Sequence, residues 1–539
     1  MTSSAHVDTF TRDHLPPEEL WPDLIIPQGS VYDYPERLNC AVALLDEMVA
    51  SGHADRPLFH TASGAQTYAE FQREVNRLAH VLVDDMGVVP GNRVLLRGPN
   101  TPRLAACWFA VMKVGAVAVT TMPLLRAYEL GYTAEKAQVH HALCDARFRE
   151  DLDKAKAETP LLEHIMYYGA SGELEDLMAR KPDTFEAVDT AADDVALIAF
   201  TSGTTGRAKA TMHFHRDVLA ICDAFPRACM DVRPDDVFVG TPPLAFTFGL
   251  GGLLLFPMRF GASAAFVEKP GVETLLATIQ DHGATTCFTS PTAYRAMLQR
   301  IDEFDVSSLR ECVSAGEPLP LPTFKAWKEA TGIEIIDGIG STEMLHIFIS
   351  APAGEIKPGT TGKPFGSYEA KVVDRVTGEQ LPAGEVGLLA VRGPTGCRYL
   401  DDPERQREYV RDGWNYPGDA YLVDDDGYFH YQARADDMII SSGYNIAGPQ
   451  VESALLKHEA VAECGVIGVP HEERGQIVKA FVVLRDGRQP GDDLKKELQD
   501  FVKGEIAPYK YPRAVQFVEQ LPRTQTGKLQ RFKLREWGD

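Results

Sequence analysis

Strand-like apolar runs alternate with helix-like segments through the chain to about residue 430. The clearest predicted helix begins at a capping-box pattern over 67–70, continues with apolar residues at helical spacing, and can end at Gly87. Its apolar face is formed by Phe71, Val75, Leu78 and Leu82. Strands are expected over 93–97, 141–144, 195–200, 264–267, 285–288 and 333–336. Strands that alternate with helices predict βαβ units and mainly parallel sheets.

The pattern changes after about residue 365. Short alternating runs over 369–373 and 387–391 predict a small antiparallel or barrel-like piece. Beyond residue 434 a compact pattern predicts helices near 449–458 and 492–502 and strands near 462–469 and 480–484. We therefore expect an α/β protein with a large N-terminal domain (1–435), made of βαβ subdomains and a small barrel-like β piece, and a small α+β C-terminal domain (436–539).

Composition narrows the possible partners. Lys and Arg total 54 against 77 Asp and Glu, a formal net charge of −23, and no dense basic run interrupts this. Such a charge repels nucleic acid and anionic membranes, so neither is an expected partner. Nine scattered cysteines without a C-x-x-C pair argue against a zinc site or disulfide framework and favour reduced thiols in the cytoplasm. The N-terminus lacks the features of a signal peptide, and the apolar stretch 244–267, interrupted by Pro257 and Arg259, is expected to be buried core.

The segment 201–210, Thr-Ser-Gly-Thr-Thr-Gly-Arg-Ala-Lys-Ala, directly follows a strand-like run. Backbone N–H groups and hydroxyls with few side chains around them suit a polyphosphate, and a lysine adds positive charge. The Walker A spacing is absent, and a flexible polar turn is the alternative interpretation. The candidate phosphate ligands are Thr201, Ser202, Gly203, Thr204, Thr205, Gly206 and Lys209.

This segment resembles the phosphate loop of the acyl-adenylate-forming superfamily, which includes acyl-CoA synthetases, peptide-synthetase adenylation domains and luciferases. Ala208 and Ala210 stand where the family usually has Pro and Gly, and neither change removes a phosphate ligand. Several later segments resemble the family's other motifs in the same order, so the resemblance spans roughly residues 40–535.

The resemblance implies an ATP site. Ala315, Gly316, Glu317 and Pro318 match the adenine-contacting segment, with Ile339 in place of the usual aromatic residue. Asp337 would accept from the adenine amino group, and Asp419 and Arg434 would contact the ribose. Thr342 can bond a phosphate oxygen. A carboxylate beside ATP phosphates needs a cation between them, so Glu343 is the expected Mg²⁺ ligand.

The same resemblance places a hinge at Asp436, about which the C-terminal domain would swing. The loop around Gly443 and Tyr444 would then face the pantetheine arm of coenzyme A. Lys528, which by itself is a surface lysine after a turn, matches the family's catalytic lysine. Its ammonium would bridge the attacking carboxylate and the α-phosphate.

Two segments are expected to line the acid pocket, and they resemble those of benzoate-type CoA ligases, ligases of 2-aminobenzoate in particular. They contribute Thr247, Phe248, Gly249, Gly340, His346 and Ile347. An aromatic ring, a bare glycine and a branched aliphatic suit one planar ring, although Phe248 and Ile347 are equally compatible with ordinary core packing. A neutral His346 offers one donor and one acceptor, which could accommodate an ortho amino group.

We therefore expect an aryl-CoA ligase for 2-aminobenzoate or benzoate that uses ATP, Mg²⁺ and coenzyme A, as a monomer or homodimer. The alternatives are a CoA ligase for another small acid (phenylacetate, hydroxybenzoate or a medium-chain acid), an enzyme that loads a carrier protein, and a catalytically inactive nucleotide-binding module. His213 and His215 are expected to be structural residues of the helix that follows the phosphate loop.

Overall fold

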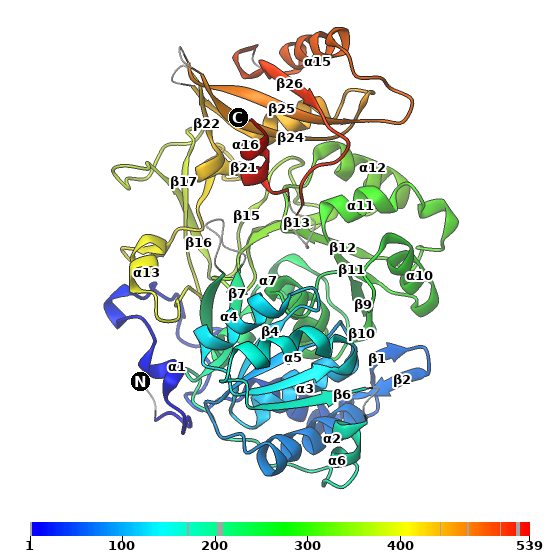
Figure 1. The fold of residues 1–539 in the computed structure, drawn as a ribbon, viewed down its shortest axis with the longest axis vertical. Coiled ribbons are helices and arrows are strands. Elements are labelled where there is room, and N and C mark those ends of the chain that lie inside the picture. The colour runs from blue at the N-terminus through cyan, green and yellow to red at the C-terminus, as the bar shows by residue number, and fades with distance from the viewer. Residues whose placement is uncertain are drawn as a thin grey trace.

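The computed structural model describes residues 3–169, 172–201, 208–441, 444–471, 474–506, 508–523 and 529–538. Its first sheet has the order β6-β5-β3-β4-β7-β8. The strands are β6 (His164–Tyr168), β5 (His141–Asp145), β3 (Arg93–Arg97), β4 (Val117–Thr121), β7 (Val195–Thr201) and β8 (Lys209–Phe214). All pairs are parallel except β7–β8. Helices α3 (Pro102–Lys113), α4 (Ala127–Ala137) and α5 (Arg149–Glu158) connect its strands (Figure 1).

The second sheet has nine strands in the order β15-β14-β13-β12-β11-β9-β10-β1-β2. They are β15 (Lys363–Pro364), β14 (Ile347–Ser350), β13 (Ile335–Gly340), β12 (Glu311–Ala315), β11 (Thr286–Thr289), β9 (Val237–Gly240), β10 (Ser263–Phe266), β1 (Pro57–Thr61) and β2 (Gly64–Thr67). From β13 to β1 neighbouring strands run parallel, and the crossovers include α10 (Val272–His282), α11 (Pro291–Met297) and α12 (Leu321–Thr331). Both sheets confirm the predicted βαβ organisation.

The predicted helix after residue 67 is α2 (Tyr68–His80), and Thr67 with Glu70 forms the capping box. The helix continues through a π-helical turn, Val81–Asp85, and Gly87 follows at a φ of 67°, a left-handed conformation that glycine adopts readily. Leu78 and Leu82 are both fully buried, as the helical spacing requires.

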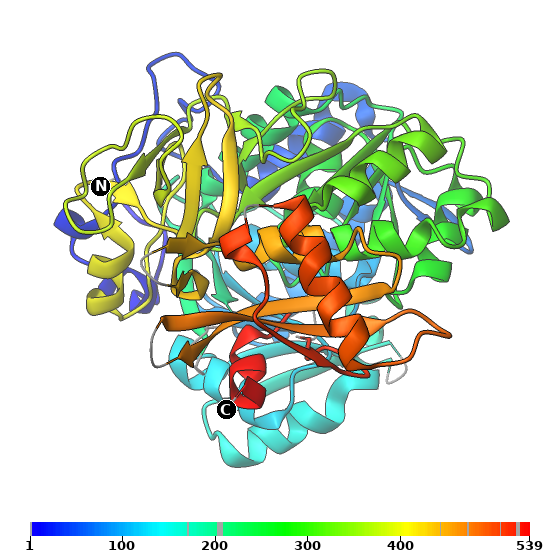
Figure 2. The ribbon, with the colours of Figure 1, turned by 90° about the horizontal axis from the view of Figure 1, so that it is seen from above.

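The predicted antiparallel piece is a six-stranded sheet. It contains β16 (Glu369–Val373), β17 (Gly387–Arg392), β18 (Val410–Arg411), β19 (Trp414–Asn415), β20 (Asp419–Val423) and β21 (Phe429–Arg434). The C-terminal sheet contains β22 (Ile439–Ser441), β23 (Tyr444–Ile446), β24 (Val461–His471), β25 (Gly475–Leu484) and β26 (Ala514–Phe517), with α14 (Gly448–Leu455), α15 (Asp492–Glu505) and α16 (Arg531–Gly538). These C-terminal elements gather at one end of the molecule in Figure 1 and overlie the larger part in Figure 2. The boundary at Asp436 stays a prediction.

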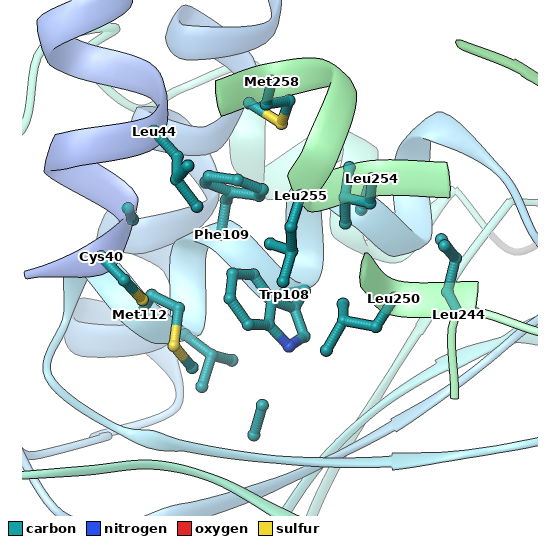
Figure 3. Close-up of a cluster of buried hydrophobic side chains, with 14 of the residues drawn as sticks. Cys40, Leu44, Trp108, Phe109, Met112, Leu244, Leu250, Leu254, Leu255 and Met258 are labelled. Carbon is teal, nitrogen blue, oxygen red and sulfur yellow. The ribbon is translucent and has the colours of Figure 1, made fainter. Parts of the chain in front are cut away.

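The largest apolar cluster includes most of the buried residues of the stretch 244–267, as expected for core. This stretch forms α8 (Thr247–Leu250), a π-helical turn (Gly251–Leu255), α9 (Phe256–Arg259) and β10. Figure 3 shows Leu255 and Met258 of this stretch near Trp108 and Phe109 of α3. Fully burying one such side chain stabilises the fold by about 1.5–3 kcal/mol. No described helix is long and apolar enough to cross a bilayer.

All nine cysteines are buried and none is paired in a disulfide. Burial raises the pKa of every one of these thiols above its ordinary value, because the thiolate would lose its hydration. They are therefore held as unreactive thiols at neutral pH.

Candidate active site

The strands on either side of the phosphate-loop segment pair as the two arms of a β-hairpin, and the chain reaches a helix only after the second strand. Strands β7 and β8 pair antiparallel, with Thr201 opposite Lys209. The prediction that His213 lies in the next helix is wrong, because His213 is on β8, whereas His215 is the first residue of α7 (His215–Cys229). The predicted ligands Ser202, Gly203, Thr204, Thr205 and Gly206 lie outside the described residues.

A segment 190 residues away in sequence adds a third chain to this hairpin. Leu400 N–H donates to Ala210 O at 2.9 Å, and Met212 N–H donates to Arg398 O at 2.8 Å. Tyr399 lies opposite Thr211 in this antiparallel pairing.

The side chain of Arg398 anchors the added segment. It is fully buried, donates to Asp217 Oδ2 at 3.0 Å, and its guanidinium lies 4.1 Å from the centroid of the Phe214 ring. Because Asp217 belongs to α7, the segment is fixed to the helix that follows β8 as well as to β8 itself.

Thr342 and Glu343 lie on a loop that the hairpin and the added segment hold from two sides. The Tyr399 hydroxyl donates to Glu343 Oε1 at 2.8 Å. His213 Nε2 lies 2.8 Å from Thr342 O. Burial lowers the pKa of His213 to about 4, so the ring is neutral at pH 7 and its proton is assigned to Nε2, which donates to this carbonyl.

Further bonds fix the rest of this loop. The hydroxyls of Ser341 and Tyr409 are 3.2 Å apart, and Thr395 Oγ1 donates to Met344 O at 2.8 Å. Leu345 is buried at a φ of 67°, an uncommon conformation for a bulky residue that surrounding structure must impose. These bonds fix the position of the loop between β13 and β14.

The loop joins β13 to β14 as a second hairpin, and this brings the predicted acid-pocket residues together. Gly340 pairs with Ile347 across the two strands. A Cβ at Gly340 would lie 2.7 Å from His346 O, so the close pairing requires glycine. Ile347 is 2% exposed.

The His346 ring is buried in an aromatic cage. Its centroid lies 4.6 Å from that of Phe256, 5.7 Å from Phe248 and 5.8 Å from Phe225. Burial lowers the pKa of His346 to about 3, although the nearby Phe248 backbone favours the charged form. Neither ring nitrogen has a hydrogen-bond partner of good geometry among the described residues.

Gly251 ends the segment that was expected to line the acid pocket, and the structure adds that it makes room for this histidine. A Cβ there would lie 2.5 Å from His346 Cδ2. The Gly251–Gly252 pair inside an apolar run was the available signal. Thr247 and Gly249 lie in α8 beside Phe248, and Gly249 approaches the Pro243 carbonyl so closely that a Cβ would lie 2.2 Å from its oxygen.

The predicted adenine contacts lie at the carboxyl ends of neighbouring parallel strands. Ser314 of β12 is opposite Asp337 of β13, and its hydroxyl donates to Asp337 Oδ1. Burial raises the pKa of Asp337 to about 7, against the opposing effect of that bond. Ala315 ends β12, and Gly316 (φ 89°), Glu317 and Pro318 follow; Glu317 accepts from the Thr292 hydroxyl at 2.6 Å.

The predicted ribose contacts are opposite each other on β20 and β21. Arg434 Nη1 donates to Asp419 Oδ2 at 3.1 Å and to Pro417 O at 2.7 Å. Gly418 has a φ of 82°, and a Cβ there would lie 2.8 Å from Arg434 Nη2. The two predicted residues therefore form an ion pair.

A pocket of about 360 Å³ lies beside the phosphate-loop hairpin. Its lining combines Lys209 with charged residues from the segment after β17, and Tyr399 forms part of its wall. The lining residues are Tyr132, Lys136, Ala208, Lys209, Ala210, Tyr399, Leu400, Asp402, Glu404, Arg405 and Glu408. Desolvation lowers the pKa of Lys209, and the nearby Arg405 lowers it further.

The other predicted site residues are farther along the chain. Asp436 lies in a 3₁₀ turn, Ala435–Asp437, and Tyr444 begins β23. Gly443 and Lys528 lie outside the described residues. Over the described ranges, no group of three or more His, Cys, Asp or Glu side chains could hold a metal by itself.

Glu343 nevertheless suits a cation that is shared with a substrate. Oε1 accepts from Tyr399, and Oε2 has no hydrogen-bond partner within the part of the chain that is described. Mg²⁺ in nucleotide sites is typically held by one or two carboxylates and the phosphates.

Comparison with known proteins gives consistent matches over nearly the whole chain. A family model described as AMP-binding enzyme matches residues 46–398, and one described as AMP-binding enzyme C-terminal domain matches residues 450–528. The benzoate–CoA ligase of Thauera aromatica is 36% identical over 507 residues, covering 93% of this chain and 96% of that protein. The 3-hydroxybenzoate–CoA ligase of Aromatoleum sp. (strain CIB) is 33% identical over 509 residues, covering 93% and 97%.

One solved structure matches at a TM-score of 0.90 and 35% identity, covering 95% of this chain and 99% of its own. It is the anthranilate CoA ligase AuaEII in complex with anthranoyl-AMP.

Proposed function

The chain belongs to the AMP-binding enzyme family, and from this premise we propose that it is an ATP-dependent aryl-CoA ligase for benzoate or 2-aminobenzoate. The observation that carries the proposal is the hairpin between β13 and β14. Its loop holds Thr342 and Glu343 against the phosphate-loop hairpin and its added segment, and its strand ends pair Gly340 with Ile347, the residue after His346. One rigid element thus links the expected acid pocket to the expected phosphate site.

The reaction has two halves. A carboxylate oxygen of the acid attacks the α-phosphorus of ATP, the bond to pyrophosphate breaks, and an aryl-adenylate forms. The sulfur of coenzyme A then attacks the carbonyl carbon, AMP leaves, and the thiol proton passes to solvent. Asp337 would hold the adenine amino group, and Asp419 with Arg434 the ribose. Mg²⁺ at Glu343 would neutralise charge on the phosphates.

The two proposed roles that involve movement of the C-terminal domain rest on the sequence motifs. Lys528 would bridge the carboxylate and the α-phosphate during adenylation. A swing at Asp436 would then exchange Lys528 for the Gly443–Tyr444 loop, which would receive the pantetheine arm. Both roles are carried over from the family resemblance.

A substrate panel tests the proposed reaction. Pyrophosphate release and CoA-thioester formation are measured with benzoate, 2-aminobenzoate, hydroxybenzoates, phenylacetate and hexanoate. We expect the highest kcat/KM for benzoate or 2-aminobenzoate with free CoA. A preference for phenylacetate or hexanoate would refute the aryl assignment, and adenylation without thioester formation from free CoA would favour a carrier-loading enzyme.

His346 is the proposed discriminator for an ortho amino group. A neutral imidazole whose nitrogens have no well-oriented partner among the described residues can gain a hydrogen bond from an amino substituent that benzoate lacks. We expect His346→Leu to lower the ratio of kcat/KM for 2-aminobenzoate over benzoate by roughly tenfold, because one hydrogen bond would be lost. An unchanged ratio would remove His346 from this role.

A further inference from the structure

We propose that Tyr399 is a positioning residue that orients Glu343 for the Mg²⁺ bound with ATP. The inference rests on the proposed function, since it assigns Glu343 to that cation. Tyr399 itself lies outside every motif that the sequence indicated. It comes from the segment that pairs with β8, more than 50 residues after the loop it contacts.

The hydrogen bond has a fixed direction. A tyrosine phenol ionises only at about pH 10, so it carries its proton at neutral pH. A carboxylate only accepts, and the phenol therefore donates to Glu343 Oε1. Oε1 then keeps one lone pair, and Oε2, which has no hydrogen-bond partner within the described ranges, is the better placed of the two to bind a cation.

The phenol is itself held rigidly. Tyr399 is 1% exposed, and its ring centroid lies 5.7 Å from that of Tyr409 in an edge-to-face arrangement. Backbone bonds on either side fix its neighbours to β8, and the buried Arg398–Asp217 pair fixes the segment to α7. A donor on such a support can orient a glutamate whose side-chain torsions would otherwise be free.

Holding Glu343 in advance matters because of its charge. The phosphates of ATP repel an unshielded carboxylate, so an unrestrained Glu343 would turn away when ATP binds without a metal. The Tyr399 bond keeps the carboxylate at the phosphate side, where it favours ATP with Mg²⁺ over ATP alone. The predicted consequence is a Mg²⁺ dependence of ATP binding that the Tyr399 hydroxyl strengthens.

The experiment measures the Kd for ATP by calorimetry with excess Mg²⁺ and with EDTA, and takes the ratio of the two. In Tyr399→Phe, which deletes only the hydroxyl, we expect the advantage given by Mg²⁺ to fall by roughly tenfold, the scale of one hydrogen bond to a charged group. Because the ratio is taken within one protein sample, partial unfolding cancels. Equal loss of affinity with and without Mg²⁺ would overturn the proposal, since the hydroxyl would then act on the nucleotide.

Tyr409→Phe is the matched control. It deletes a buried hydroxyl from the neighbouring ring, and that hydroxyl bonds Ser341 of the same loop and forms no hydrogen bond with Glu343. We expect the Mg²⁺ advantage to change by less than about twofold, well below the scale of a lost bond to a charged group. An effect as large as that of Tyr399→Phe would show general loosening of the loop and overturn the specific role.

A double-mutant cycle with Glu343→Gln completes the test. If Tyr399 acts through Glu343, Tyr399→Phe should change the Mg²⁺ advantage little once Glu343→Gln is present. Additive effects would overturn the proposal. Failure of the wild-type protein to bind ATP under either condition would count against the proposed function itself, which separates the two failures.

Discussion

Replacing His346 by leucine should make the fold more stable. The side chain is 2% exposed, and both ring nitrogens are buried without a partner of good geometry in the described structure. A buried polar group left unsatisfied costs about 1–3 kcal/mol. Leucine has a similar size and no polar atom, so His346→Leu should raise the free energy of unfolding by about that amount at pH 7.5.

The gain should grow in acid. Burial lowers the pKa of His346 to about 3, against 6.5 for an ordinary histidine. Below pH 6.5 His346 is protonated in the unfolded wild-type chain but stays neutral in the folded chain. The wild type therefore loses stability as the pH falls toward 3. The leucine variant has no such loss. From pH 7.5 to pH 5.5 the difference between the two proteins should widen by about 1.4 kcal/mol.

Urea unfolding followed by tryptophan fluorescence at pH 7.5, 6.5 and 5.5 measures both effects. His53→Gln is a suitable control, because that side chain is at the surface, where its Nδ1 lies 3.0 Å from Ser51 Oγ. A gap between wild type and His346→Leu that stays constant with pH would refute the neutral, desolvated histidine. A less stable leucine variant would show that the nitrogens are satisfied in the fold. The pairing of higher stability with lower selectivity would identify His346 as a residue kept for substrate recognition.

Three further predictions concern the nucleotide. Lys528→Ala should slow adenylate formation by at least about 10²-fold and spare thioester formation from supplied adenylate; equal loss in both half-reactions would contradict its assigned role. Because burial raises the pKa of Asp337 to about 7 and an adenine amino donor would favour its ionised form, ATP affinity should rise as the pH rises through 7. Asp337→Asn should remove this rise of ATP affinity with pH. Because ATP itself titrates identically with both proteins, the difference between their pH profiles reports Asp337 alone. Identical pH profiles would disprove the proposed contact between Asp337 and adenine. Asp419→Asn should raise the KM for ATP by roughly tenfold, because it weakens both the bond to Arg434 and the proposed ribose contact, while the KM for the acid stays unchanged; a parallel change in both would argue against a ribose role.

Local sequence patterns predicted most of the helices and strands, because capping and hydrophobic periodicity act between residues that are close in sequence. The capping box at Thr67 and the apolar face that continues to Leu82 specify α2 and the π-helical turn after it without long-range contacts. The hairpin around the phosphate loop was missed, since β8 is buried on both faces. His213, which is fully buried, packs beneath a loop more than 100 residues later in the sequence. A strand that is buried on both faces has no regular alternation of apolar and polar residues, so its sequence shows neither a helical nor a strand-like period.

The residues of the candidate site likewise fall into those that the sequence could predict and those that it could not. Residues that would touch ATP or the acid occur in short motifs that a sequence can reveal. The residues that support those motifs do not occur in recognisable motifs of their own. Tyr399 belongs to a separate segment, and Gly251 is visible in the sequence only as a glycine in an apolar run. Their roles depend on pairings between distant segments, which neither periodicity nor spacing records.

The burial of every cysteine makes this chain ready for site-directed labelling. Thiol-reactive dyes should leave the native protein unmodified, so an introduced cysteine needs no substitution of the native ones. Tyr128, which is 73% exposed, and Asp492, whose side chain is 95% exposed, lie on either side of the predicted hinge at Asp436. A fluorophore pair at these two positions would report the swing of the C-terminal domain as a change in energy transfer during turnover.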